Sequence, residues 1–342
     1  MIEQPPAPQM GHNAPPQRFA FPLKIGTSKE LGIFILLVVL CIFVSIMSHG
    51  TFLHTDNLQN TSRSIGLYGI FSIGAGIVII TGGIDLSVGA LFALFGVLLS
   101  LMLTNPTHPW PWPLAILAII AGGALIGAFH GFLITRVRLQ PFIVTLCGLL
   151  FYRGIARFIT GDSTAGFGEA TGFKSLQELA TGSLLGVPVP FVLLVIVALV
   201  MGVVLHRSVY GRYLYAVGRN EEAARYSGVN TRRIIAGAYI ISGLLASVSA
   251  ILFAFFTNSV EPSTQGQSYE LYGIAAAVLG GCSLRGGEGS IIGILIGAAL
   301  LQVLQNLVNL LNIPSSLNFA VVGAVILLGV ITDQLLKKRG KA

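Results

Sequence analysis

The chain has 342 residues, of which 54% are apolar and only 10% are charged, and its mean hydropathy is +0.83. This composition excludes an ordinary soluble protein, in which about a quarter of the residues are charged. The formal net charge of +7 does not indicate nucleic-acid binding, because the basic residues flank apolar segments and no basic folded domain exists to carry that function.

Ten apolar runs follow one another along the chain, and most are close to the roughly 20 residues that a membrane-spanning helix needs. The eighth run is short and rich in glycine. The pattern predicts an all-α integral membrane protein with about ten transmembrane helices in a single domain, residues 31–336. The runs cover approximately 31–48, 64–81, 86–104, 113–134, 141–159, 189–206, 234–256, 270–282, 290–310 and 317–336.

The two ends of the chain are polar. Residues 1–30 are rich in proline and predict a disordered cytoplasmic tail, and residues 337–342 form a short basic tail. The first apolar run lacks a small-residue cleavage site where it ends, so we expect a retained first helix and not a removed signal peptide.

Lysine and arginine positions predict the orientation. If the N-terminus is cytoplasmic, all of the 20 basic residues except four fall in cytoplasmic segments. The positive-inside rule therefore favours ten spans with both termini in the cytoplasm. The four exceptions lie outside or near the outer helix ends: Arg63, Arg153, Arg157 and Lys174.

Two glycine-pair segments interrupt the apolar runs. Thr81–Gly89 lies between the second run and the third, and Leu279–Gly287 begins within the last residues of the eighth. A Leu-Tyr-Gly-Ile tetrapeptide precedes each, at 67–70 and 271–274, which indicates a weak internal repeat of two related halves.

Asp85, in the first of these segments, has two interpretations. It caps the next helix in a cytoplasmic turn with assistance from Ser87, or it belongs to a broken helix that borders the transport pathway or a gate. Gly82 and Gly83 supply the backbone freedom that either arrangement requires.

Polar residues near the outer helix ends also have two interpretations. Arg153 and Arg157 lie on one helix face, and either extend to lipid headgroups or, with Arg63 and Lys174, meet carboxylates of a partner outside the cytoplasm. Asn306 and Asn309 belong to a stripe that contacts a hydroxylated solute or satisfies polar groups between helices.

The loop 207–233 is the only long polar loop of the chain that is heavily basic. Within it, the stretch 217–228 carries a Glu-Ala-Ala-x-x-x-Gly pattern, which predicts a short, exposed polar helix that ends at a glycine. Such an element suits docking of a soluble partner. The residues of interest are Glu221, Glu222, Ala223, Ala224 and Gly228.

The chain lacks the residues of an ATP-hydrolysing or metal-dependent enzyme. It has no phosphate-binding Gly-x-x-x-x-Gly-Lys-Ser/Thr run, its histidines are scattered, and its three cysteines lie in apolar runs without the spacing of a disulfide framework or metal site. An intramembrane protease using Ser242 and His130 is a weak rival, because Ser-Gly pairs are common in packed helices.

Five motifs, in order, resemble those of the ribose-type sugar permeases, the membrane subunits of bacterial ABC importers. They are Thr81–Gly89, Gln140–Thr145, Tyr152–Gly154, the loop 217–228 and Gly280–Gly287, and the similarity extends over nearly all of residues 31–336. The chain departs from the general coupling signature, because no Ile-x-Leu-Pro follows Gly228.

The resemblance implies a permease in the bacterial inner membrane that moves a monosaccharide by alternating access. It implies a cytoplasmic ATPase that uses ATP and Mg, a periplasmic sugar-binding protein, and a second permease copy or paralogue. By motif, Glu222, Ala223, Ala224 and Gly228 would couple the chain to the ATPase. No cofactor is expected on this chain itself. The alternative is an ion-coupled secondary transporter of small polar solutes, for which Asp85 would be an unusually isolated coupling residue.

Overall fold

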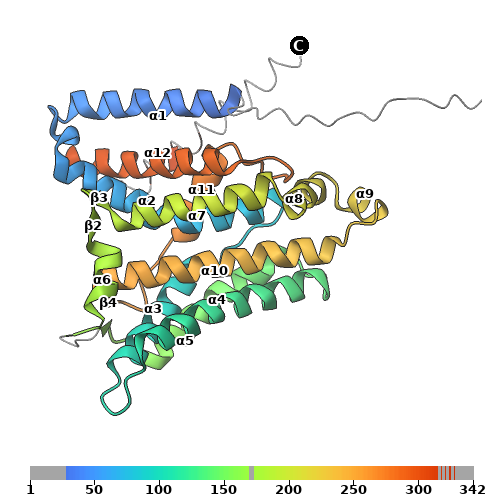
Figure 1. The fold of residues 1–342 in the computed structure, drawn as a ribbon, viewed down its shortest axis with the longest axis horizontal. Helices are drawn as coiled ribbons and strands as arrows, with labels where there is room; N and C mark the ends of the chain where they lie inside the picture. Colours follow the sequence, from blue (N-terminus) through green and yellow to red (C-terminus); the bar gives the residue numbers. More distant parts are fainter. Residues whose placement is uncertain are drawn as a thin grey trace, which may run out of the picture.

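The computed structural model describes residues 28–168 and 173–314 and, beyond these, residues 317, 320, 323, 324 and 327. Within this part the chain is almost entirely helical (Figure 1). The helices are α1 (Ser28–Met47), η1 (Thr51–Leu53), α2 (Thr55–Ile80), α3 (Val88–Thr104), α4 (Trp112–Thr135), α5 (Pro141–Thr160), α6 (Lys174–Thr181), α7 (Val189–His206), α8 (Val209–Arg219), α9 (Glu221–Tyr226), α10 (Thr231–Thr257), α11 (Tyr269–Leu279) and α12 (Ile291–Leu310).

Seven of these helices are long and apolar enough to cross a membrane: α1, α2, α4, α5, α7, α10 and α12. The apolar helices α3 and α11 are shorter. Nine of the ten predicted runs are therefore helices, although α2 begins nine residues before its predicted start at residue 64. The tenth run, 317–336, and the predicted tails 1–30 and 337–342 lie wholly or mostly outside the described residues.

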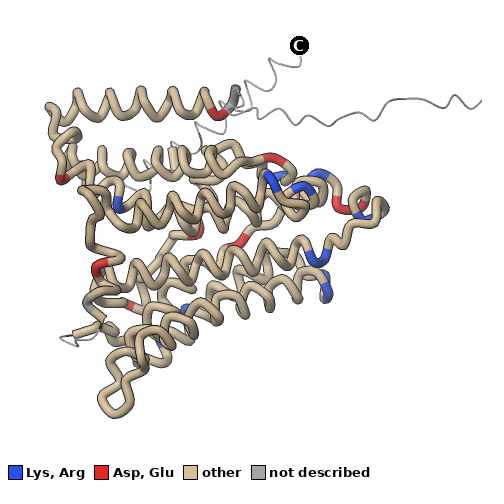
Figure 2. The backbone as a smooth tube through the Cα atoms, viewed as in Figure 1, with Lys and Arg blue, Asp and Glu red and all other residues tan. Residues whose placement is uncertain are grey.

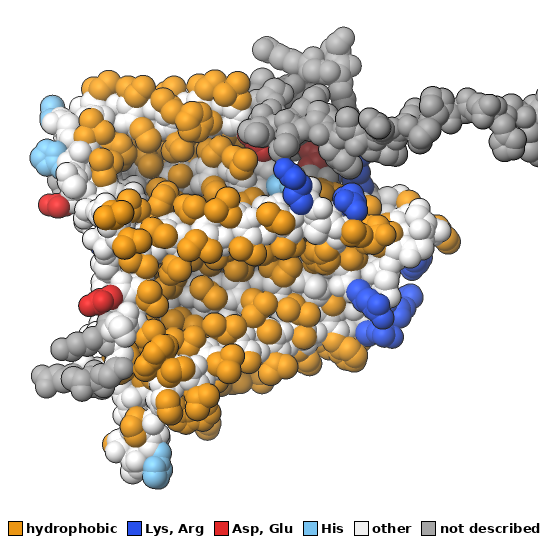
Figure 3. Space-filling model, in the orientation of Figure 1, with side chains coloured by type: hydrophobic (Ala, Val, Ile, Leu, Met, Phe, Trp, Pro, Cys, Tyr) orange, Lys and Arg blue, Asp and Glu red, His pale blue; other side chains and the backbone are white. Residues whose placement is uncertain are grey.

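Helices α2 and α10 form the centre of the bundle. Helix α2 packs against α7, α10, α11 and α12, and α10 also packs against α3 and α4, whereas α1 lies at the edge against α12 (Figure 1). The outward faces of the peripheral helices are apolar along their length (Figure 3). This exposed apolar surface suits contact with lipid.

Glycines bring α4 and α10 into backbone contact. A Cβ at Gly127 would lie 2.3 Å from the Tyr239 carbonyl oxygen, and one at Gly123 would lie 2.4 Å from that of Gly243. Gly131 faces Ala236 one turn further along. Because larger side chains would separate the two backbones, this stripe fixes the position of α10.

The two ends of the bundle differ in charge (Figure 2). One end carries α8, α9 and the start of α10, with arginines at 207, 212, 219, 225, 232 and 233. We call it the basic end. The other, the sheet end, carries α6 and two small antiparallel sheets (Figure 1). In these, β1 (Ala165–Gly166) pairs with β4 (Ser259–Val260), and β2 (Ser183–Leu184) pairs with β3 (Val187–Pro188).

The segment 261–268 descends from the sheet end into the bundle. Strand β4 lies beside Gly96 of α3, whereas Gly266 packs against the carbonyl of Gly89, about two turns closer to the start of that helix. Helix α11 therefore begins inside the bundle. Its 11 residues span about 16 Å, roughly half of a bilayer's hydrocarbon core.

Candidate functional site

The exposed part of the basic end is built from two short helices. Helix α8 is amphipathic: Gly211, Leu214 and Val217 are buried, and Ser208 caps its start by accepting a hydrogen bond from the Gly211 amide at 3.1 Å. Helix α9 follows directly, capped by Asn220, whose side chain accepts from the Ala223 amide at 2.9 Å. The predicted short polar helix is therefore present.

Gly228 ends this helix in the way that its sequence position predicted. Its φ of +85° is left-handed. The Gly228 amide donates to the Arg225 carbonyl, and the Val229 amide donates to that of Ala224. These two bonds form a Schellman motif, which favours glycine because other residues are strained at positive φ.

The residues of the predicted coupling set have different environments on α9. Ala224 is buried, and Glu221 accepts a hydrogen bond from Thr231 of α10 at 3.1 Å, so these two residues attach the helix to the bundle. Glu222 points outward and lies 3.9 Å from Arg225. Tyr226 is 83% exposed, with the Arg225 guanidinium over its ring.

The sequence pattern did not single out Arg225 and Tyr226, which also lie on the outward surface of α9. An aromatic residue in an otherwise polar loop was the available signal, because large exposed aromatics often anchor protein interfaces. Together with Glu222 they give α9 a small, mixed outward surface.

Both glycine-pair segments end their helices by the same motif as α9. Gly82 has φ +84° and closes α2, with the Gly83 amide donating to the Val78 carbonyl at 3.2 Å. Gly281 has φ +89° and closes α11, with the Cys282 amide donating to the Ala277 carbonyl at 2.9 Å. We call residues 81–87 the first break and residues 280–290 the second break.

The first break folds back into the bundle. Asp85 is only 4% exposed, and its partner Ser242 on α10 also touches Gly74, which lies well before the end of α2. Asp85 is thus not in an exposed turn at the helix ends. Its place beside a transport pathway or gate stays a prediction.

The Asp85 carboxylate accepts three hydrogen bonds. One oxygen accepts from the Ser87 amide at 3.0 Å and the Ser87 hydroxyl at 2.6 Å, and the other accepts from the Ser242 hydroxyl at 2.9 Å. Thr145 of α5 donates to the Ile84 carbonyl at 3.2 Å. The break is therefore bound to both α10 and α5. These bonds offset the cost of burying a carboxylate among apolar helices.

The protease constellation of Ser242 and His130 is not formed. Ser242 donates to Asp85, and the Nε2 of His130 is 2.8 Å from the hydroxyl of Tyr152. The Ser242 hydroxyl thus donates to a carboxylate and not to the histidine base that a serine nucleophile requires.

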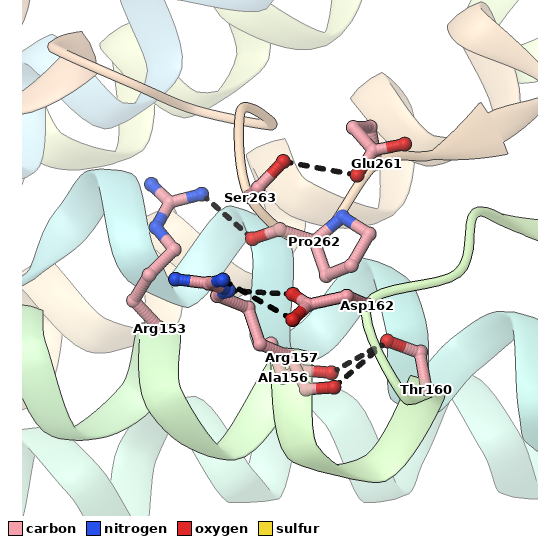
Figure 4. A network of polar contacts seen from close by, with 8 residues as sticks. All are labelled: Arg153, Ala156, Arg157, Thr160, Asp162, Glu261, Pro262 and Ser263. Carbon is pink, nitrogen blue, oxygen red and sulfur yellow. Dashed lines mark hydrogen bonds and ion pairs between the residues drawn. The ribbon is translucent and has the colours of Figure 1, made fainter.

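Arg153 does not fit the predicted docking set or the headgroup interpretation. Its guanidinium donates to the backbone carbonyl of Pro262 at 3.2 Å (Figure 4). It also donates to the carbonyls of Gln265 at 2.5 Å and Gly89 at 3.4 Å. Non-helical backbone at membrane depth needs such donors, because lipid supplies none. Arg153 therefore holds the descending segment 261–268 against α3.

The other three basic residues of the predicted docking set lie at the sheet end. Arg157 forms an exposed ion pair with Asp162, with Nε and Oδ1 2.5 Å apart, and this bond lowers the pKa of Asp162 (Figure 4). Arg63 donates to Asn60 and to the Thr181 carbonyl, each at 3.0 Å. Lys174 is the first residue of α6.

Glu261 shares the sheet-end surface with this ion pair. Its carboxylate accepts hydrogen bonds from the hydroxyls of Thr164 at 2.6 Å and of Ser263 at 3.0 Å, and these bonds lower its pKa. Figure 4 shows the bond from Ser263. The sheet end therefore presents carboxylates as well as arginines.

The asparagine stripe is separate from the first break. The side-chain amides of Asn306 and Asn57 exchange hydrogen bonds at 2.8 and 3.2 Å, which joins α12 to the start of α2. Asn57 precedes Gly74 by about 25 Å along α2. Asn306 thus satisfies a polar group between helices and does not join Asp85 in one site, and Asn309 is exposed.

Metal chemistry finds no support in the described part of the chain, where no group of three or more His, Cys, Asp or Glu side chains is placed to hold an ion. The arrangement consists of an exposed surface of mixed charge on α9, two glycine-capped breaks and a buried carboxylate.

Comparison with known proteins identifies a transport family. Residues 57–330 match the family described as branched-chain amino acid transport system / permease component. Ribose import permease protein RbsC of Bacillus subtilis (strain 168) is 40% identical over 313 residues, which cover 90% of this chain and 94% of that protein.

Further relatives belong to the same class. RbsC of Escherichia coli (strain K12) is 40% identical over 299 residues, covering 87% of this chain and 92% of that protein. The D-allose transport system permease protein AlsC of the same strain is 33% identical over 305 residues, covering 89% and 91%. No solved structure matches the chain.

These matches confirm the resemblance to ribose-type permeases that the five motifs indicated, and they do not favour the ion-coupled alternative. The family match extends from the start of α2 past the end of α12, so the breaks and the α8–α9 loop all lie within it. The chain therefore belongs to this family of transport-system permease components, as the multi-pass membrane subunit of a bacterial ABC importer in which a separate subunit is the ATPase.

Proposed function

We propose that this chain forms the membrane pathway of a monosaccharide importer. The observation that carries the proposal is its identity of 40% to a ribose import permease over nine-tenths of the chain. Relatives named for fructose and D-allose import support a sugar as the solute class.

In this proposal the basic end faces the cytoplasm and the sheet end faces the periplasm. The arginines gathered around α8, α9 and the start of α10 support this orientation through the positive-inside rule (Figures 2 and 3). With the tenth run, 317–336, added as a helix, the chain crosses the membrane ten times and both termini are cytoplasmic.

A cytoplasmic ATPase docks on α9 and hydrolyses ATP with Mg. The outward side chains of Glu222, Arg225 and Tyr226 supply an acidic, a basic and an aromatic contact, while Ala224 and Glu221 transmit force to the bundle. Two permease subunits, identical or paralogous, present one such surface to each of two ATP-binding cassettes.

A periplasmic sugar-binding protein docks on the sheet end. Arg157, Lys174 and Arg63 are the basic residues there, and carboxylates of the binding protein compete with Asp162 for the exposed Arg157. Arg153 is not part of this surface.

Transport proceeds by alternating access. Closure of the ATPase subunits moves the loop 207–233, and the bundle opens toward the periplasm to receive sugar. Gly82, Gly83, Asp85 and Ser87 act as a gate next to the pathway, because the buried break is the polar discontinuity that a moving helix pair could open.

The test is sugar uptake in proteoliposomes that contain the permease, its ATPase and its binding protein. We expect ATP-dependent uptake of one sugar from a panel of pentoses and hexoses, abolished by Glu222→Lys. The matched control is Glu222→Asp, which keeps the carboxylate on α9 and should keep uptake. Uptake driven by an ion gradient without the ATPase would overturn the proposal.

A further inference from the structure

Helix α8 lies between the proposed docking helix α9 and the two breaks. It covers the end of α2 and the second break, and its backbone meets theirs directly. A Cβ at Gly218 would lie 1.9 Å from the Ile80 carbonyl oxygen and 2.5 Å from the Gly287 amide nitrogen. Both contacts are with backbone atoms, so an alanine at residue 218 could fit only if α8 moved away.

The second break makes an equally close approach in return. A Cβ at Gly286 would lie 2.7 Å from the Gly218 carbonyl oxygen and 2.8 Å from the Gly82 amide nitrogen. Three separate parts of the chain, α8, the first break and the second break, therefore meet backbone to backbone around two glycines. Nothing flexible lies between them.

Two hydrogen bonds join the second break to the end of α2 and to α8. The Gly287 amide donates to the carbonyl of Ile80, the last residue of α2, at 2.8 Å. The last carbonyls of a helix have no hydrogen-bond partner within that helix, and the second break supplies one for Ile80. The Tyr215 hydroxyl of α8 donates to the Gly289 carbonyl at 2.6 Å.

Tyr215 is suited to donate such a bond. A tyrosine hydroxyl is protonated at physiological pH, and burial raises the pKa of Tyr215 further, so the group is available as a donor. Tyr213, two residues earlier on the same helix, is exposed and points away from the contact.

We propose that α8 and the two breaks form one mechanical joint, with Tyr215 as a positioning residue and Gly218 as its contact point. The inference rests on the proposed docking of the ATPase at α9. Movement of α9 is passed through α8 to the second break and to the end of α2 together. From the end of α2 it reaches the first break, where Asp85 is bound to Ser242 of α10.

The joint predicts a loss of coupling that is separate from loss of folding. In proteoliposomes with the ATPase and binding protein, Tyr215→Phe removes one hydrogen bond and leaves the packing of the ring. We expect the number of ATP molecules hydrolysed per sugar imported to rise about three- to tenfold, the change in an equilibrium constant that one such bond makes. Tyr213→Phe is the matched control and should leave that ratio unchanged.

Gly218→Ala tests the contact point in the same assay. Its control is Gly202→Ala on α7, where an added Cβ meets nothing within 4 Å. We expect Gly218→Ala to raise the ratio more than Tyr215→Phe does. If it prevents folding, the Tyr215 result decides alone.

The outcomes separate this inference from the proposed function. Wild-type uptake that depends on the ATPase establishes the function by itself. If Tyr215→Phe then lowers the amount of folded complex but keeps the wild-type ratio of ATP to sugar, Tyr215 is merely structural and the joint is wrong. If the wild-type complex imports no sugar, the proposed function fails before the joint is tested.

Discussion

The two breaks end their helices identically and then diverge. Gly82 and Gly281 each stand two residues after the last helical residue, with the same pair of backbone bonds. The first break then turns inward and is held by Ser242 and Thr145. The second turns toward the basic end, where Leu284 and Arg285 are exposed and α8 holds it through Tyr215.

This difference shows that the same glycine cap can precede two different arrangements of the chain. A glycine cap stops a helix and frees the following residues, but what these residues bind depends on the neighbouring helices. The first break carries the buried carboxylate, and the second carries the contact with α8. The bond between Gly287 and Ile80 connects the two.

The largest effect is expected from moving α10, because Ser242 on this helix holds Asp85 of the first break. Gly127→Val places side-chain atoms against the Tyr239 backbone and separates α4 from α10. Such overpacking destabilises the folded protein by about 1–3 kcal/mol or more. We expect little or no monodisperse protein after detergent extraction. Gly154→Val on α5, where no atom lies within 4 Å, should extract normally. Equal yields would show that the glycine stripe does not fix α10.

A large effect on transport is expected at the first break. Asp85→Ala leaves the Ser87 and Ser242 hydroxyls without their acceptor, at about 1–3 kcal/mol for each buried group left unsatisfied. Uptake should fall at least tenfold, while Asp85→Asn should retain more activity because it keeps one acceptor oxygen. Asp56→Ala, at an exposed position in the first turn of α2, is the control. Similar uptake in Asp85→Ala and Asp56→Ala would remove the first break from the mechanism.

A moderate effect is expected at Arg153. This residue bonds the non-helical segment 261–268 inside the bundle, as α8 bonds the second break at the basic end. Arg153→Lys replaces a planar fork with a single ammonium group, which cannot bond the Pro262 and Gln265 carbonyls with the same geometry. Loss of about 1 kcal/mol should speed amide hydrogen exchange in residues 261–268 about fivefold. Arg157→Lys, one turn along the same helix, should leave that exchange unchanged, and equal effects would contradict the assigned role.

The smallest effect is expected at the exposed ion pair of Arg157 and Asp162. Because the pKa of Asp162 is lowered in the folded protein, its stabilisation is present above the unfolded pKa and is lost as the pH falls through the folded pKa. Arg157→Gln should therefore lower the melting temperature slightly near neutral pH and not at all in strong acid. A difference from wild type that grew on acidification would have the wrong sign.

Local patterns predicted the helices and their ends well. Apolar runs, glycine pairs and the cap of α9 depend on residues close in sequence, and the structure has them near their predicted positions. The partners of the polar side chains could not be predicted in this way. Ser242 is 157 residues from Asp85, and Asn306 is 249 residues from Asn57.

Arg153 illustrates the limit most clearly. Its position near an outer helix end suggested lipid headgroups or a docking protein, because sequence gives no sign that backbone carbonyls descend to meet it. Those carbonyls belong to residues 109 and 112 positions away. Only the short length of the eighth apolar run signalled that α11 begins inside the bundle.

The most direct test of the central claim measures distances between spin labels in the reconstituted complex. Labels replace three exposed residues, Tyr213 on α8, Leu284 in the second break and Leu185 at the sheet end, after the exposed Cys147 has been replaced by alanine. Between the nucleotide-free and ATP-trapped states, the distance from Tyr213 to Leu284 should stay constant while both shift relative to Leu185. A change in the distance from Tyr213 to Leu284 would show that α8 moves independently of the breaks and would contradict the account.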